Sequence, residues 1–136
     1  WCNLVFESPV QGKQVTLSVT YRQIDTNDPE TNVDYAFSIM SNNDNTYPVS
    51  DQIFYKISSP STEFKRVSAT FTSQKYIGFF MKVSTEGQTA GLYRTIEIKD
   101  IQLELGSTAT PYKSYPPPPI SDPKFKQRIT RYSCFI

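Results

Sequence analysis

The residues in this chain best suited to chemistry are aromatic and amide side chains in a polar loop, and that chemistry is sugar binding. Residues 41–50 read SNNDNTYPVS, so Tyr47 stands beside Asn43, Asp44 and Asn45. Aromatic rings stack on the apolar face of a sugar, and amides and carboxylates hydrogen-bond its hydroxyl groups. Loops on a rigid scaffold often carry such contacts. The simpler alternative, which the loop alone favours, is an ordinary polar loop with Tyr47 packed against a sheet.

Three further residues are candidate ligand contacts because they fall outside the apolar stripes of the expected strands. Tyr76, Tyr93 and Arg22 each lie off such a stripe. Arg94 shares the parity of the apolar stripe near it, so we expect it at a sheet end or paired with an acid. For each of the three candidates, an exposed sheet residue without a ligand is the alternative interpretation.

The composition argues against catalysis. The chain has no histidine, which removes the Ser–His–Asp and Cys–His mechanisms and the commonest metal ligand. It has five glycines and no glycine-rich phosphate loop. Its acidic residues fall in polar loops or at exposed strand positions, where nothing apolar would raise a pKa for acid catalysis. We therefore expect no enzyme and no catalytic residue.

A metal site is a weaker candidate. Asp100 and Glu7 are the acids that a structural calcium ion near the first and last strands would use. One carboxylate does not make a six-to-eight-ligand site. We expect no metal ligand or other cofactor, and structural calcium is the alternative.

The elements that position these residues are β-strands. Apolar and polar residues alternate with a period of two, and no segment has a sustained helical period. The alternating segments are 15–22, 33–40, 53–57, 66–71, 77–83 and 96–105. Short strands separated by turns every eight to twelve residues indicate an all-β fold, an antiparallel β-sandwich or jelly roll.

The last of these segments changes its buried face partway along. Ile96 and Ile98 share one parity, whereas the apolar residues of 101–105 share the other. A strand keeps one face buried only if it keeps its register. The change at Lys99–Asp100 therefore predicts a β-bulge or a strand break.

The C-terminal part of the chain differs from the body. Residues 1–112 hold nine Lys/Arg and twelve Asp/Glu, whereas residues 113–136 hold five Lys/Arg and one acid. Residues 115–119 read YPPPP, which favours an extended spacer because proline donates no ladder hydrogen bond. We expect a domain over 1–112, a Pro-rich spacer over 113–119, and a basic tail or the start of another element over 120–136.

Charge and hydropathy exclude two classes of partner. The body is mildly acidic, which argues against nucleic acid binding because phosphate recognition needs a clustered cationic face. No apolar run approaches the roughly 20 residues that a membrane helix needs, so we expect no membrane insertion. Cys2 and Cys134 are the two cysteines, too few and too far apart for a typical disulfide scaffold, so we favour free thiols, and a Cys2–Cys134 disulfide is the alternative.

Three segments resemble a known family. Residues 12–18 (GKQVTLS), 64–72 (FKRVSATFT) and above all 98–112 (IKDIQLELGSTATPY) resemble strands of carbohydrate-binding-module-like jelly rolls. The last segment is typical of modules in bacteriophage tail, baseplate and host-recognition proteins. The resemblance covers roughly residues 1–112. Because these domains usually begin with a further strand and only eleven residues precede Gly12, we expect the first strand to be shortened, missing or supplied by a neighbour.

The resemblance implies a β-sandwich that contacts cell-surface polysaccharide or decorates a virion. The expected function is a non-catalytic carbohydrate-binding or host-adhesion module of a phage tail or baseplate, located in the virion and acting outside the cell. Expected partners are polysaccharide, other virion proteins and further copies in a homo-oligomer. The alternatives are a structural decoration or connector domain and an accessory module of a polysaccharide-degrading enzyme. A groove shared by Tyr47, Tyr76 and Tyr93 would favour sugar binding.

Overall fold

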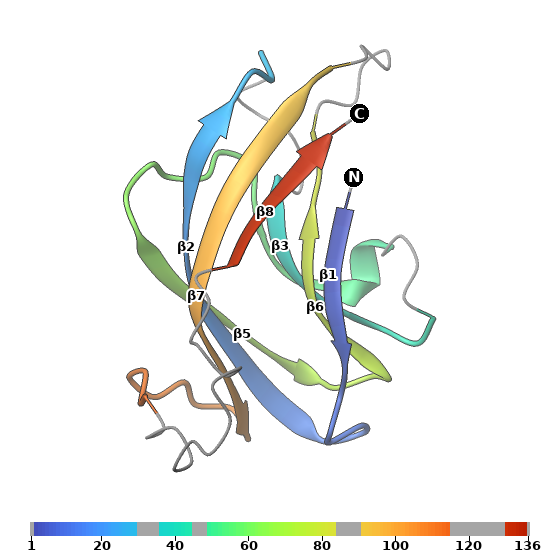
Figure 1. Cartoon of the computed structure of the whole chain (residues 1–136). Coiled ribbons are helices and arrows are strands. Elements are labelled where there is room, and N and C mark those ends of the chain that lie inside the picture. Colours follow the sequence, from blue (N-terminus) through green and yellow to red (C-terminus); the bar gives the residue numbers. More distant parts are fainter. Residues whose placement is uncertain (1, 30–35, 45–48, 84–90, 115–129, 136) are drawn as a thin grey trace, which may run out of the picture.

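The computed structural model shows an all-β chain with two four-stranded antiparallel sheets (Figure 1), and it describes residues 2–29, 36–44, 49–83, 91–114 and 130–135. In order across sheet A, the strands are β1 (Cys2–Glu7), β6 (Tyr76–Met81), β3 (Phe37–Asn42) and β4 (Ile53–Ile57). In sheet B they are β5 (Lys65–Thr72), β2 (Gln14–Thr26), β7 (Tyr93–Leu105) and β8 (Thr130–Phe135). A short 3-10 helix, η1 (Ser50–Gln52), precedes β4.

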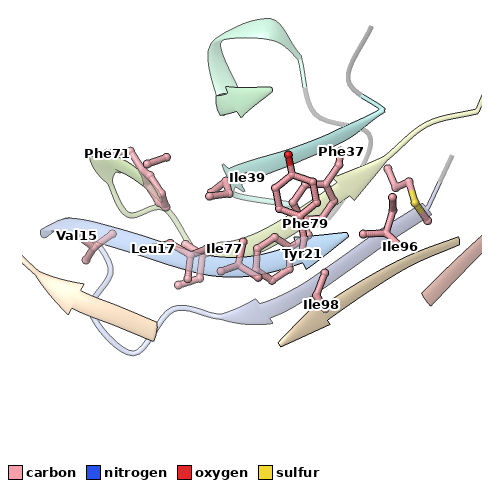
Figure 2. Close-up of a cluster of buried hydrophobic side chains, with 13 residues drawn as sticks. Val15, Leu17, Tyr21, Phe37, Ile39, Phe71, Ile77, Phe79, Ile96 and Ile98 are labelled. Carbon is pink, nitrogen blue, oxygen red and sulfur yellow. The ribbon is translucent and has the colours of Figure 1, made fainter. Parts of the chain in front are cut away.

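The two sheets pack face to face around one hydrophobic core. Alternate residues of β2 point inward and meet inward residues of β3 and β6, as the period of two predicts. The Phe37 ring stacks on Tyr21 with centroids 4.7 Å apart and on Phe79 at 5.6 Å (Figure 2). Burial, with a smaller effect of Tyr55, raises the pKa of the Tyr21 phenol, so this ring stays neutral in the core. The core confirms the expected all-β architecture of two antiparallel layers.

The first strand is present in this chain, contrary to the expectation of a shortened, missing or borrowed one. β1 pairs along its whole length with β6, from Cys2 opposite Met81 to Glu7 opposite Tyr76. The two strands approach closely at Gly78. An added Cβ there would collide with the carbonyl oxygen of Leu4 and lie 2.8 Å from Cα of Val5. A glycine at this position therefore lets β1 join sheet A.

The change of face in β7 is a β-bulge, as the sequence predicted. Thr20 lies opposite Lys99 and Ser18 opposite Gln102, so two residues of β7 face one residue of β2. Asp100, the first of those two, has a φ of 53°, the left-handed conformation found in one class of bulge. The bulge resets the register, so that Leu103 packs against the core.

Sheet B extends past the domain boundary expected at residue 112. β8 pairs antiparallel with the first half of β7, from Tyr93 opposite Phe135 to Ile98 opposite Thr130. The segment expected to be a basic tail or the start of another element thus supplies β8, an edge strand of the same sheet. The YPPPP segment lies outside the described residues. Within the described ranges, no helix has the length and apolarity that a membrane crossing would require.

Candidate functional site

The outer face of sheet B carries a cluster of cationic and aromatic side chains. We call this cluster the Phe64 platform, and it consists of Thr20, Arg22, Phe64, Arg66, Lys99 and Tyr112. Three strands and two loops contribute to it: β2, β5, β7, the turn before β5 and the segment after β7. The ring of Phe64 is 37% exposed, about as much as Phe6 and Phe54, and it differs from them in having two cations beside it.

The turn before β5 positions Phe64 over the sheet. The Gln23 amide donates a 2.8 Å hydrogen bond to the Ser61 carbonyl, which ties this turn to β2. Phe64 shares the parity of the outward residue Arg66, whereas Val67 has the opposite, inward parity. The ring therefore lies on the solvent side of the sheet, beside the outward side chains of β2.

Arg22 is the best-anchored residue of the platform. Its Nε and Nη2 atoms both lie 2.8 Å from Oε2 of Glu97, its cross-strand partner on β7. Glu97 is buried, whereas the Arg22 side chain is 39% exposed. The guanidinium carbon lies 4.4 Å from the centroid of the Phe64 ring, within cation–π distance. The ion pair fixes the guanidinium under the ring, and the ring remains partly open to solvent.

A second row crosses the sheet through Thr20. This threonine lies opposite Arg66 on β5 and opposite Lys99 on β7. The Lys99 Nζ lies 3.9 Å from the Phe64 ring centroid. The Arg66 Nη1 donates a 2.8 Å hydrogen bond to the carbonyl of Asp100, at the bulge. The guanidinium carbon of Arg66 also lies 5.6 Å from the Tyr112 ring centroid. The bulge thus helps to hold a cation on the platform.

The segment after β7 folds back over the other half of this face. This return segment, residues 106–114, appears in orange near the lower end of β7 (Figure 1). Thr110 donates to Glu104 from its amide at 3.0 Å and from its hydroxyl at 2.6 Å. These hydrogen bonds lower the pKa of Glu104. The Lys113 amide donates to Oε1 of Gln102 at 3.1 Å. The return segment therefore bounds the platform on one side.

Three of the residues predicted as sugar contacts lie together at one end of sheet A. The Asn43 Oδ1 accepts a 3.3 Å hydrogen bond from the Lys75 amide, and the ammonium of Lys75 lies 5.2 Å from the Tyr76 ring centroid. Asp44 follows Asn43 in the chain and is exposed. Tyr47 and Asn45, from the same predicted loop, lie outside the described residues.

The other two predicted contacts lie elsewhere. Tyr93 begins β7 at the end of the molecule where β2 ends, and its hydroxyl donates a 2.9 Å hydrogen bond to Asp25. This hydrogen bond raises the pKa of the Tyr93 phenol. Tyr76 begins β6 at the opposite end, near the start of β2 (Figure 1). A 13-residue strand such as β2 spans about 40 Å. Tyr76 and Tyr93 therefore share no groove, and Arg22 belongs to the Phe64 platform.

The remaining charged candidates have structural positions. Arg94 is buried and pairs with Asp28 at 3.2 Å, while its Nη1 donates to Gln23 Oε1 at 2.6 Å, which confirms the predicted pairing with an acid at a sheet end. Glu7 ends β1 in sheet A, whereas Asp100 lies at the bulge in sheet B. In the part of the chain that the structure describes, no three Cys, Asp or Glu side chains form a group able to hold a metal ion.

Of the residues on the Phe64 platform, sequence reasoning proposed Arg22 as a ligand contact and did not propose the residues around it. A signal for Phe64 was present, because its parity matches the polar residues of β5 rather than the apolar ones. Lys99 had a similar signal, because it follows the inward residue Ile98 and so faces the opposite, outer side of the strand. Tyr112 had no local signal, because its position depends on how the return segment folds back.

The platform combines a flat exposed ring with several N–H donors, which suits binding of a polar ring without covalent chemistry. Scans against protein-family models, curated proteins and solved structures found no match to this chain. The geometry of the platform and the segments quoted above are therefore the basis for a functional proposal.

Proposed function

We propose that this chain is a non-catalytic module that binds cell-surface polysaccharide on the Phe64 platform. The observation that carries the proposal is the exposed Phe64 ring, held against the cations of Arg22 and Lys99 on the outer face of sheet B. A sugar ring would stack on the open part of Phe64, and the nearby N–H groups would donate hydrogen bonds to its hydroxyl groups.

The platform is organised before any ligand arrives. Glu97 fixes Arg22, the Asp100 carbonyl fixes Arg66, and the Ser61 carbonyl fixes the turn that carries Phe64. Side chains that are already ordered lose less conformational entropy on binding. A weak ligand such as a single sugar unit gains most from this preorganisation.

The carboxylates described at and near the sheets support a role without catalysis. Glu97 and Asp28 are engaged in ion pairs with arginine. The pKa of Glu104 is lowered, which is the opposite of the shift that a general acid needs. These three side chains act as structural acceptors.

The biological setting proposed for the module is the tail or baseplate of a bacteriophage, outside the host cell. The resemblance of residues 98–112 to modules of such proteins supports it. We also propose a jelly-roll winding of the two sheets. Pairing of β2 with β7 and of β3 with β6, with β4 near β5 at the edge, is the nested arrangement that a rolled-up ribbon produces.

Glycan-array and cell-wall pulldown assays test the proposal. Wild-type protein should bind at least one polysaccharide, and Phe64→Ala should weaken that binding about tenfold, because stacking contributes about 1 kcal/mol or more. Phe6→Ala is the matched control, since Phe6 is 36% exposed but lies on β1 in sheet A. Equal losses in both variants, or no binding by folded wild-type protein, would contradict the proposal.

A structural connector domain of the virion is the second candidate. The separation of Tyr76 from Tyr93 favours it, because a groove lined by both residues would have supported sugar binding. The two functions predict different results for Phe64→Ala. If the chain is a connector domain, Phe64→Ala should reduce its incorporation into particles. Neither the variant nor the wild-type protein should then bind glycans.

A further inference from the structure

The acids and bases of the Phe64 platform are unevenly matched. Glu97 forms an ion pair with Arg22, whereas Glu104 accepts hydrogen bonds from the neutral Thr110 and keeps its negative charge. Among the described residues, neither Lys99 nor Arg66 has a carboxylate within ion-pair distance. Arg66 is only the smallest of the influences that lower the Glu104 pKa. The platform therefore offers two cations that have no directly paired carboxylate, of which Arg66 also feels the charge of Glu104.

These two cations have a fixed relation to each other and to the ring. Both flank Thr20, one strand away on either side, so their Cα atoms lie about 10 Å apart. Lys99 touches the Phe64 ring and Arg66 lies near the Tyr112 ring. Each cation is thus beside an aromatic surface, and each retains N–H groups that can donate outward.

We propose that the platform selects polysaccharides that carry anionic groups, carboxylate or phosphate, over neutral ones. This inference rests on the proposed function and specifies its ligand class. One sugar unit stacks on Phe64, and the anionic groups of that unit or its neighbour accept hydrogen bonds from Lys99 and Arg66. Charge-assisted hydrogen bonds to carboxylate and phosphate are about twice as strong as neutral ones, so they decide between ligands of similar shape.

A matched set of ligands tests the inference by calorimetric titration. The probes are oligogalacturonate, the same oligomer with every carboxyl methyl-esterified, and poly(glycerol phosphate). The first two share a backbone and differ in charge, and the third distinguishes phosphate from carboxylate recognition. At least one anionic probe should bind about tenfold or more tightly than the methyl ester, and added salt should weaken that binding.

Substitutions locate the effect on the platform. Lys99→Gln and Arg66→Gln should each reduce affinity for the anionic probe about fivefold to tenfold and leave binding of the methyl ester nearly unchanged. Lys13→Gln is the control, because Lys13 is an exposed cation in the turn before β2. Thermal melts of all three variants establish that they fold.

The outcomes separate this inference from the function on which it rests. Equal or tighter binding of the methyl ester would overturn the anionic preference and leave the proposed function standing. Failure of all three probes would overturn the anionic preference, whereas the proposed function would fall only if the glycan array and the cell-wall pulldown also found no ligand. Equal affinity for a 20-nucleotide single-stranded DNA would also overturn the inference, because binding would then follow charge without sugar recognition.

Discussion

The outer faces of the two sheets differ sharply in what they expose. On sheet A, four outward residues of β3 and β6 are fully buried: Ser38, Met40, Asn42 and Phe80. On sheet B, Phe64 is 37% exposed, and Arg66 and Thr70 on β5 are exposed as well. Outward residues on the central strands of sheet B are buried too, namely Thr16, Ser18 and Glu97. The difference is therefore that sheet A buries apolar side chains on its outer face, whereas sheet B buries polar ones there and exposes an aromatic ring at its β5 edge.

This difference predicts how much the aromatic residues of the two sheets contribute to stability. A phenylalanine on the outer face of sheet A stabilises the fold, because its surface is removed from water. A phenylalanine at the edge of the outer face of sheet B contributes less to folding, because much of its surface stays in water. Phenylalanine on the outer face of sheet A should therefore contribute more to the free energy of unfolding than Phe64 does on sheet B.

The largest expected effect on stability comes from replacing Phe80 of sheet A by alanine, in comparison with Phe64 of sheet B. Phe80→Ala should lower the free energy of unfolding by about 3–5 kcal/mol, because it removes a buried ring and leaves a cavity. Phe64→Ala should lower it by about 1 kcal/mol or less. Urea denaturation measures both. Similar losses in the two variants would break the comparison between the faces.

Crowding in sheet A extends to the backbone at Gly78. Gly78→Ala should lower the free energy of unfolding by about 2–3 kcal/mol and should expose the amides of β1 to hydrogen exchange, because an added Cβ collides with that strand. Gly12→Ala is the control, since its Cβ would meet nothing within 4 Å and only the positive φ is strained. Equal effects at the two glycines would show that β1 does not pack so closely.

The bulge in sheet B should respond to backbone preference. Asp100→Gly should change stability by less than about 0.5 kcal/mol, because glycine adopts the left-handed conformation freely but costs more entropy on folding. Asp100→Val should lower stability by about 1–2 kcal/mol, because a β-branched residue resists a positive φ. Thermal melts compare the variants. A fully stable Asp100→Val protein would contradict the bulge geometry.

The smallest effect concerns the return segment and pH. The hydrogen bonds from Thr110 hold the pKa of Glu104 below its usual value of 4.5, so they favour the charged carboxylate. Attachment of the segment should therefore be complete above pH 4.5 and should be lost as the pH falls through the lowered pKa. NMR titration of the Thr110 amide follows it. Thr110→Val should move the Glu104 pKa upward, and an unchanged pKa would contradict the contact.

Local patterns were enough to predict much of the chain. Alternation placed inward and outward residues along β2 and β7, the switch of parity predicted a bulge or a strand break at Lys99–Asp100, and the parity of Arg94 predicted a sheet-end position or an acidic partner. The reason is that a strand repeats every two residues, so each side chain is assigned to a face by its neighbours alone.

Contacts between distant segments decided the rest. Pairing of β1 with β6 and of β8 with β7 joins segments that are far apart in the chain, and no periodicity reveals such partners. Alternation also cannot show that the polar face of β3 is covered. The sequence determined which side of its strand each residue occupies. Only the tertiary structure decided which sides are enclosed and that Arg22, Phe64 and Lys99 meet, because burial and juxtaposition depend on what packs across each face.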